Sequence, residues 1–328
     1  MNDTRFDSDW RDDIYIPDVL DIPLVFPRDA RRKPAKSVWV QSRFEREETS
    51  FDQEFRRGRV ITYLLKRSDA IQYNELRDSK GNPVPKEDDT YDAIFRPQAW
   101  MTDALQERCM VYAAAQCARG KVLTGGLGLA IYPQFCFFLQ RPVDTITVVE
   151  KEPDVIDLVM EALSPQISPE ARSCLHVVGG TMEAFLQESL ELFDTIYLDT
   201  WDNMDPRFLP WVNHLVRLAL PRCAPHGQIQ CWGYTRMVET FIEHTEAYVE
   251  RKIDLSRFHL DPAMERFAAW FADHSDAPRE TVRSISREIA LTTAAPLESY
   301  SLSECLTPFS RSRLEMMMNR NLSLRNKA

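Results

Sequence analysis

Residues 121–129, with the sequence KVLTGGLGL, combine a short apolar run with a tight glycine-rich turn. An apolar segment of helical length, residues 130–139, follows directly. Glycine lets the backbone turn sharply and lets a ligand approach the main chain without a Cβ in the way. The free N–H groups at the start of the next helix would face such a ligand. The turn therefore predicts a strand, a loop and a helix that begin a nucleoside-binding unit.

An acidic residue follows this turn at the distance that nucleoside-binding units of this kind require. Glu150 stands directly after residues 146–149, with the strand-forming sequence ITVV, roughly 20 positions beyond the glycines. An acid at the tip of the second strand can accept hydrogen bonds from the two hydroxyls of a ribose. We therefore expect Glu150 to hold a ribose, and an exposed charge at a strand end is the simpler alternative.

Apolar runs of strand length alternate with helical segments through the middle of the chain. Such alternation predicts an α/β fold, a doubly wound and mostly parallel sheet of Rossmann-like type, with ligands at the carboxyl ends of the strands. Strands are expected at residues 121–124, 145–149, 175–178, 195–198 and 228–232. Helices are expected between them at residues 129–139, 153–163, 181–190 and 207–220.

The N-terminal region carries weaker patterns. Residues 1–37 are rich in Asp, Arg and Pro, which indicates an extended arm with at most a short strand. The spacing of apolar residues predicts an amphipathic helix within residues 38–72. A turn-rich composition predicts a hairpin over residues 73–96. Residues 98–118 are expected to form a loop that leads into a helix.

The C-terminal region is expected to be mostly helical, because its apolar residues recur at helical spacing and it ends in a polar tail after residues 314–318. It would form a helical cap or a surface for self-association into a homodimer. The expected division of the chain is an N-terminal arm, helix and hairpin lid at 1–97, a nucleoside-binding core at 98–235, and a helical extension packed on the core at 236–328.

Composition and charge disfavour several classes of partner. The chain has 328 residues and a net charge of −10, which disfavours contact with a nucleic-acid backbone. No apolar run reaches the length of about 18 residues that a membrane span needs, and the acidic N-terminus lacks the apolar core of a secretory signal. We expect a small-molecule substrate rather than nucleic acid or membrane.

Cysteine and histidine patterns give no sign of a disulfide framework or a metal site. The seven cysteines include no CxxC pair, and their number is odd, so free thiols in a reducing cytoplasm are expected. The six histidines form no HxxxH or HxH pair. His176 lies inside a strand pattern and is more typical of a packed core histidine than of a catalytic base.

With these residues placed, the chain resembles the class I S-adenosylmethionine (SAM) dependent methyltransferases, and within them the spermidine-synthase-like type. The resemblance rests on three motifs in order at the expected strand ends, and it covers about residues 98–235. The first motif is KVLTGGLG at 121–128, the second is TVVEKEPDVI at 147–156, and the third is FDTIYLDTW at 193–201. The segment WMTDALQE at 100–107 is similar to the loop before the first motif in that subgroup.

The resemblance implies SAM as the donor and assigns residues to it. The residues expected to contact SAM are Thr124, Gly125, Gly126, Gly128, Glu150, Gly180, Thr181, Met182, Asp199 and Asp103. One departure stands at Gly180, where the family usually carries an Asp that accepts a hydrogen bond from the adenine amino group. Thr181 would substitute through its hydroxyl or backbone, with Met182 packed on the ring.

Four residues are expected to act on the reacting groups: Asp199, Trp201, Asp202 and Tyr234. In the resembled family an acid at the position of Asp199 orients or deprotonates an amine, or holds the methionine ammonium. A helix N-cap is the simpler alternative for Asp199, while for Asp202 the N-cap and the functional role are equally favoured. Trp201 and Tyr234 are either core anchors or rings that face the sulfonium charge.

Several functions fit this set. Methyl transfer to a small molecule is the leading hypothesis. The alternative is attack at the aminocarboxypropyl side, which releases methylthioadenosine, either to an acceptor or by cyclisation to azetidine-2-carboxylate. A non-catalytic nucleoside-binding protein is a third hypothesis. A dinucleotide dehydrogenase is disfavoured because the turn lacks the full GxGxxG pattern.

Overall fold

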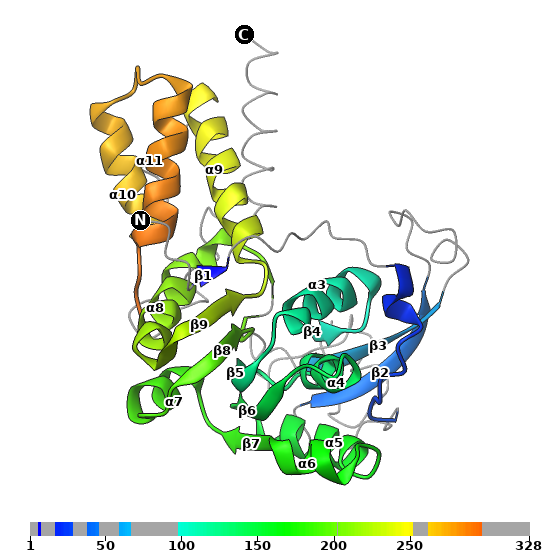
Figure 1. Cartoon of the computed structure of the whole chain (residues 1–328). Helices are drawn as coiled ribbons and strands as arrows, with labels where there is room; N and C mark the ends of the chain where they lie inside the picture. The colour runs from blue at the N-terminus through cyan, green and yellow to red at the C-terminus, as the bar shows by residue number, and fades with distance from the viewer. Residues whose placement is uncertain are drawn as a thin grey trace, which may run out of the picture. The chain divides into compact units, whose positions relative to one another are not determined.

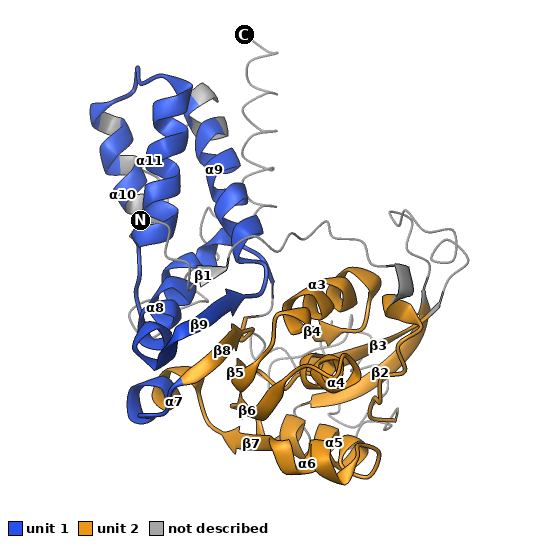
Figure 2. Cartoon of the chain, viewed as in Figure 1, with its two compact units in different colours: residues 1–12, 186–192, 203–328 blue, residues 13–185, 193–202 orange. Residues whose placement is uncertain are grey.

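A computed structural model describes residues 6–7, 17–28, 38–45, 59–66, 98–201, 203–251 and 262–296. Its residues divide into two compact units that interleave along the sequence (Figure 2). We call residues 13–185 and 193–202 the core unit, and residues 1–12, 186–192 and 203–328 the helical unit. The expected domain boundaries at 97 and 235 stay a prediction.

The core unit contains four parallel strands in the order β8-β5-β6-β7 (Figure 1). They are β5 (Gly120–Gly125), β6 (Val143–Glu150), β7 (Leu175–Gly179) and β8 (Phe193–Leu198). Most of their apolar residues are buried, as the near-continuous apolar runs predict for a parallel sheet, but on β7 Val177 is half-buried and Val178 is exposed. Each lies where a strand was expected.

Helices connect these strands and cover the sheet. The chain runs from β5 through α4 (Ile131–Phe138) to β6, then through α5 (Pro153–Leu163) and α6 (Pro169–Cys174) to β7. It then passes through α7 (Met182–Glu188) to β8, on the other side of β5. The direction of winding therefore reverses between β5 and β8, and ligands of open parallel sheets bind at such a switch point. This is a Rossmann-like fold, as predicted.

A second, antiparallel sheet in the core unit corrects one expectation. Its strands are β2 (Val38–Glu45), β3 (Arg59–Lys66) and β4 (Gln98–Thr102), in the order β2-β3-β4. The helix predicted within residues 38–72 is therefore wrong for the described parts of that range. The register shifts between Leu64 and Leu65, so both are buried, and this breaks the alternation by which a strand is usually identified.

Two further elements complete the described core unit. The short 3-10 helix η1 (Pro17–Leu20) precedes the sheets. The helix expected within residues 98–118 is α3 (Leu105–Gln116), but the strand β4 stands before it where a loop was expected. Arg108 on α3 is buried and donates two hydrogen bonds to the carbonyl oxygens of Val19 (2.7 Å) and Ile22 (2.8 Å). Part of the predicted N-terminal arm is thereby fixed to α3. The predicted hairpin at 73–96 lies outside the described residues.

The helical unit contains a parallel strand pair and a helical part. The short strand β1 (Phe6–Asp7) pairs with β9 (Cys223–Cys231). Before β9 come η2 (Pro206–Phe208), α8 (Leu209–Ala219) and η3 (Leu220–Arg222). After it come α9 (Tyr234–Arg251), α10 (Pro262–Asp273) and α11 (Arg279–Thr292). The helices α9, α10 and α11 were expected, while residues 252–261 and the tail after residue 296 lie outside the described residues.

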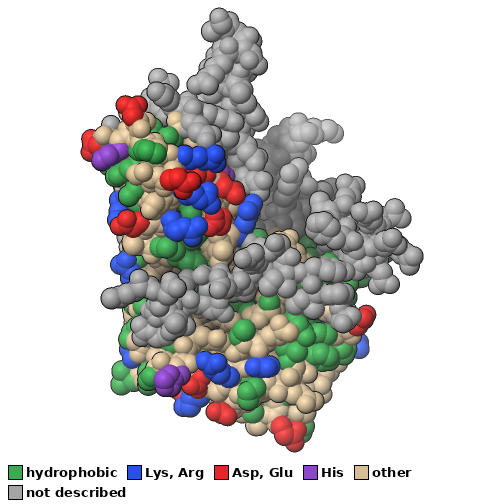
Figure 3. Space-filling view, turned by 45° about the horizontal axis from the view of Figure 1, so that its top comes forward, with side chains coloured by type: hydrophobic (Ala, Val, Ile, Leu, Met, Phe, Trp, Pro, Cys, Tyr) green, Lys and Arg blue, Asp and Glu red, His purple; other side chains and the backbone are tan. Residues whose placement is uncertain are grey.

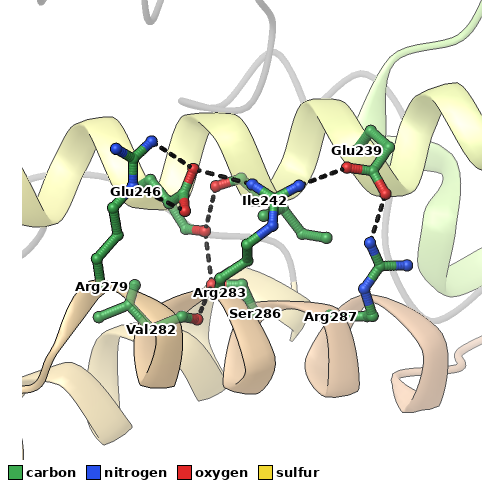
Figure 4. Close-up of polar contacts among 9 residues, drawn as sticks. Glu239, Ile242, Glu246, Arg279, Val282, Arg283, Ser286 and Arg287 are labelled. Atoms are coloured by element: carbon green, nitrogen blue, oxygen red, sulfur yellow. Dashed lines mark hydrogen bonds and ion pairs between the residues drawn. The ribbon is translucent and has the colours of Figure 1, made fainter.

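An ion-pair ladder joins α9 to α11 (Figure 4). Arg283 lies between two glutamates, with nitrogen–oxygen distances of 3.0 Å to Glu239 and 3.2 Å to Glu246. Arg279 pairs with Glu246 at 3.3 Å, and Arg287 pairs with Glu239 at 2.5 Å. The three arginines are four residues apart, so they share one face of α11. Acidic and basic side chains accordingly lie intermixed over these helices in the space-filling view (Figure 3).

Among the helices in the described ranges, none is long and apolar enough to cross a membrane.

Candidate functional site

The carboxyl ends of the four core strands stop level with one another. Leu198, Gly125, Val149 and Val178 occupy one row across the sheet, because Gly125 is paired with Leu198 and Val149, and Val149 is paired with Val178. The residues that follow this row are Asp199, Gly126, Glu150 and Gly179. The sheet therefore brings the glycine turn, the acid of the second motif and the acid of the third motif to the same edge.

The glycine turn is closed tightly against the end of β8. The amide of Gly126 donates to the carbonyl of Val149 at 2.9 Å, and its φ of +87° is one that glycine readily adopts. A Cβ at Gly126 would lie 2.3 Å from the main-chain oxygen of Asp199, and one at Gly125 would lie 2.7 Å from Cγ2 of Thr200. The turn thus requires glycine for its backbone path and for its close approach to β8.

Glu150 holds this turn in place. Glu150 is 7% exposed, and its Oε2 accepts a hydrogen bond from the amide of Leu127 at 2.9 Å. Oε1 accepts from the amide of Glu152, also at 2.9 Å. Each carboxylate oxygen has two lone pairs, so further donors can still be bound. The acid and the glycine turn, predicted separately from the sequence, form one built unit.

The segment after β7 explains why glycine stands where the resembled family has an acid. Gly180 has φ +147°, which residues with a Cβ rarely adopt, although no atom lies within 4 Å of the position of an added Cβ. The backbone path rather than crowding selects glycine here. Thr181 uses its hydroxyl to accept from the amide of Ala184 at 3.3 Å. Met182 is buried, with Cε 2.9 Å from a Cβ built on Gly125.

Asp199 is a half-buried carboxylate at the end of β8. Burial raises its pKa to about 7, and the hydrogen bond from the hydroxyl of Tyr197 acts in the opposite direction. That hydrogen bond has an oxygen–oxygen distance of 3.4 Å to Oδ2 of Asp199. A carboxylate with a pKa near neutrality can take up or release a proton under ordinary conditions. Asp199 is therefore equipped for proton transfer, as well as for pairing with a cation.

The two residues after Asp199 differ in their surroundings. The hydroxyl oxygen of Thr200 is buried and has no hydrogen-bond partner among the described residues. A buried hydroxyl without a partner is uncommon in a folded protein, and a bound molecule can supply the missing hydrogen bond. Trp201 is 6% exposed and contributes to the core. Asp202, the second predicted acid, lies outside the described residues.

Asp103 has a structural role in this protein. It is 4% exposed, and its Oδ1 accepts from the amide of Thr62 on β3 at 2.6 Å. Its Oδ2 lies 3.8 Å from Nη1 of Arg108, the same arginine that binds the N-terminal segment. The carboxylate of Asp103 thus joins β3 to α3, and Arg108 extends the contact from α3 to η1. Contact between Asp103 and a cofactor stays a prediction.

Tyr234 belongs to the helical unit and lies in a buried hydrogen-bond network there. Its hydroxyl donates to Oδ1 of Asn213, while Nδ2 of Asn213 donates to the carbonyls of Ala290 and Thr293 at 2.7 Å each. The network connects α8, the start of α9 and the end of α11. The predicted catalytic role of Tyr234 finds no support in these contacts and stays a prediction.

The core unit therefore gathers most of the predicted cofactor residues at one sheet edge: Thr124, Gly125, Gly126, Gly128, Glu150, Gly180, Thr181, Met182 and Asp199. Three further residues were not predicted: Thr200, Tyr197 and Tyr132 of α4, whose ring stacks on that of Tyr197. Tyr197 stands two positions before Asp199, and its hydroxyl donates to the carboxylate of Asp199. The spacing of two residues between Tyr197 and Asp199 is visible in the sequence and could have identified Tyr197 as a site residue.

Among the described residues, no group of three or more His, Cys, Asp or Glu side chains could hold a metal ion.

No protein-family model matches the sequence, and no curated protein matches it. Among solved structures, the SAH-bound methyltransferase PaMTH1 of Podospora anserina is similar, with 16% identity, 58% of this chain and 67% of that chain covered, and a TM-score of 0.31. Aeropyrum pernix fibrillarin, in complex with S-adenosyl-L-methionine, is also similar. Its sequence identity is 15%, 63% of this chain and 76% of the fibrillarin chain are covered, and the TM-score is 0.26.

The CcbJ methyltransferase from Streptomyces caelestis has 16% identity, 37% of this chain and 45% of that chain covered, and a TM-score of 0.27. The present chain thus spans less than half of CcbJ. None of these three likenesses is close, so the fold assignment rests on this chain's own strand order and register. By these the core unit has a Rossmann-like parallel sheet, with a glycine turn and two acids at the edge where such sheets bind ligands.

Proposed function

We propose that this chain binds SAM at the carboxyl edge of the core sheet and transfers its methyl group to a small-molecule acceptor. The observation that carries the proposal is the hydrogen bond between Oε2 of Glu150 and the amide of Leu127. It joins the ribose-binding acid of the second motif to the glycine turn of the first, at a topological switch point. These are the parts that a nucleoside needs from such a sheet.

The residues at this edge fit SAM on two observations. An added Cβ at Gly125 or Gly126 would clash with Thr200 or with the main-chain oxygen of Asp199, so the turn keeps its main chain free of side chains at these two positions. The buried hydroxyl of Thr200 lacks a partner among the described residues, which leaves a polar group for a ligand to satisfy. In this arrangement Glu150 binds the ribose hydroxyls with its remaining lone pairs, and Met182 packs against the adenine.

SAM supplies an electrophilic methyl group on a sulfonium that is already a good leaving group. The chain then has three tasks: to align the acceptor, to exclude water and to take up a proton. Asp199 is the residue for the third task, because its pKa of about 7 balances proton affinity against availability of the charged form. Its negative form also attracts the cationic donor.

The acceptor is proposed to be a small molecule. The net charge of −10 gives no electrostatic attraction for nucleic acid. Placement in the spermidine-synthase-like subgroup, the cytoplasm as location and a homodimer as assembly remain parts of this proposal.

Product analysis tests the reaction. The full chain is incubated with SAM, first alone and then with pools of small-molecule amines, alcohols and carboxylic acids, and the products are identified by mass spectrometry. We expect S-adenosylhomocysteine to accumulate only when an acceptor is present. Methylthioadenosine formed from SAM alone faster than in a protein-free control, together with azetidine-2-carboxylate, would contradict methyl transfer and favour cyclisation. Methylthioadenosine formed only with an acceptor would favour aminocarboxypropyl or aminopropyl transfer.

A matched pair of variants makes the assignment specific to the site. Glu150→Gln removes the charge from the predicted ribose-binding acid, whereas Glu161→Gln makes the same change at an exposed position on α5. Turnover should fall strongly in the first variant and stay at the wild-type level in the second. Equal turnover in both would contradict the placement of SAM at Glu150.

A further inference from the structure

A buried pair of tyrosine rings lies beneath Asp199. Tyr197 is 1% exposed and lies on β8, two residues before Asp199, which directly follows the strand. Its hydroxyl is the donor of the 3.4 Å hydrogen bond to Oδ2 of Asp199. A buried tyrosine usually finds a partner for its hydroxyl. Here the partner is the carboxylate that the proposed reaction uses.

The ring of Tyr197 is fixed by packing from α4. The ring of Tyr132 stacks on it with centroids 4.4 Å apart and planes inclined by 17°. Tyr132 is itself buried on α4, and Phe135 of the same helix packs edge-on against Tyr112 of α3, at 5.3 Å between centroids. A side chain locked in this way holds its polar atom in one place. The hydroxyl of Tyr197 therefore has a defined position relative to Asp199.

The electrostatic surroundings keep this hydroxyl protonated. Burial, followed by the negative charges of Asp199 and of Glu107 on α3, raises the pKa of Tyr197 well above its usual value. Burial also raises the pKa of Tyr132, and Cys136 on the same helix and Cys117 at the end of α3 act in the same direction. Tyr197 can therefore act only as a neutral hydrogen-bond donor toward Asp199.

We propose that Tyr197 is a positioning residue that orients the carboxylate of Asp199 and favours its charged form, an inference that rests on the proposed SAM-dependent function. The hydrogen bond is long at 3.4 Å, and such contacts commonly shorten when a substrate closes a site. A donor to the charged form of an acid favours that form over the neutral one. Without it, burial alone would govern Asp199, and the acid would stay protonated to higher pH.

The test compares Tyr197→Phe with Tyr132→Phe. Each variant loses one buried hydroxyl and keeps its aromatic ring, so the stack is preserved in both. Only the first loses the donor to Asp199. Two readouts are taken on the full chain between pH 5.5 and 8.5. The first is the titration of Asp199, followed by carbon-13 NMR of labelled aspartate and assigned with Asp199→Asn, and the second is SAM affinity by calorimetry.

In the wild type we expect Asp199 to titrate with a midpoint near pH 7 and SAM affinity to rise through the same midpoint, because ionised Asp199 attracts the cationic donor. Tyr197→Phe should move both midpoints upward by roughly half a pH unit or more. Tyr132→Phe should leave them at the wild-type value. A Tyr197→Phe midpoint equal to that of the wild type would overturn the inference.

The two proposals fail in different ways. If the wild type binds no SAM at any pH, the proposed function fails, while the NMR titration still reports the coupling between Tyr197 and Asp199. If SAM binds normally and the midpoints coincide in all three proteins, only the role of Tyr197 fails.

If Tyr197→Phe does not fold, carbon-13 NMR of the Cζ carbon of Tyr197 in the wild type provides the test. Its chemical shift should follow the Asp199 midpoint, and a shift independent of pH over that range would overturn the inference.

Discussion

Three glycines at the carboxyl edge of the core sheet should respond differently to replacement by alanine. Gly126 has φ +87°, and its added Cβ would lie 2.3 Å from the main-chain oxygen of Asp199. Gly180 has φ +147°, but its added Cβ would meet nothing within 4 Å. At Gly179 the nearest atom would be Cδ1 of Ile156 at 3.9 Å, an ordinary contact. Replacement of Gly126 thus combines backbone strain with a clash, replacement of Gly180 causes strain alone, and replacement of Gly179 causes neither.

The expected losses follow from these geometries. Gly179→Ala should change the free energy of unfolding by no more than about 1 kcal/mol, with stabilisation the favoured sign because alanine restricts the unfolded chain. Gly180→Ala should destabilise by about 1–3 kcal/mol from its unfavourable φ. Gly126→Ala incurs similar strain together with about 1–3 kcal/mol of overpacking, since a main-chain oxygen cannot rotate away. Its total is therefore about 2–6 kcal/mol.

Urea unfolding of the full chain, followed by circular dichroism, measures the three values under identical conditions. SAM affinity of each folded variant is measured in parallel and should be lowest for Gly126→Ala. A loss for Gly126→Ala no larger than that for Gly179→Ala would refute the account of a glycine turn closed against β8. Equal values for Gly180→Ala and Gly179→Ala would show that the backbone path does not select glycine at position 180.

Other predictions concern single side chains. Arg283→Gln should destabilise by about 1 kcal/mol, less at high salt, in thermal melts, because its two ion pairs are partly exposed. Although burial raises the pKa of Glu246, pairing with Arg279 and Arg283 lowers it overall. The stability that these ion pairs contribute should therefore be present above about pH 4.5 and be lost as the pH falls below that value. Acid unfolding of Glu246→Gln that is unchanged from the wild type would contradict this. Because the pKa of Asp199 is about 7 in the folded state, the folded protein binds a proton that the unfolded chain releases, and stability falls as the pH rises from about 4 to 7. Urea unfolding at pH 8 should therefore show Asp199→Asn to be more stable than the wild type, although the variant loses turnover. Tyr234→Phe should lose about 1 kcal/mol of unfolding free energy through its buried hydrogen bond and retain SAM affinity, and a large loss of affinity would restore it as a site residue.

Much of the core fold could be predicted because its signals are local. Buried parallel strands are short apolar runs, and each here is bounded by glycine, an acid or a turn. Helix α5 begins with Pro153 at its first position and ends at Leu163, as the sequence predicts. Its proline lacks the N–H that would be unsatisfied there in any case.

The antiparallel sheet could not be predicted in the same way. On β3 both Leu64 and Leu65 are buried because the register with β4 shifts between them. The alternation of buried and exposed residues that identifies a strand is therefore interrupted within β3. The pairing with β2 and β4 is set by tertiary contacts, and the apolar spacing that remains is equally typical of a helix.

The sequence predicted the course of the main chain at the candidate site better than the contacts between its side chains. Glycines and strand-end acids have positions that follow from the fold. The contact between Tyr132 and Tyr197 joins residues far apart in sequence, and no local pattern reports it. The structural role of Asp103 was likewise hidden, because its partners Thr62 and Arg108 belong to different elements.

Isothermal calorimetry with SAM tests the central claim most directly. The wild type and Glu161→Gln should bind SAM with the same affinity, while Glu150→Gln should bind it roughly 5- to 150-fold more weakly, the equivalent of about 1–3 kcal/mol for a lost charged acceptor. Urea unfolding of Glu150→Gln serves as the control, because the same carboxylate holds the amide of Leu127. Absence of SAM binding in the wild type, or equal affinities in the folded Glu150→Gln and Glu161→Gln variants, would contradict a SAM site built on Glu150 and the glycine turn.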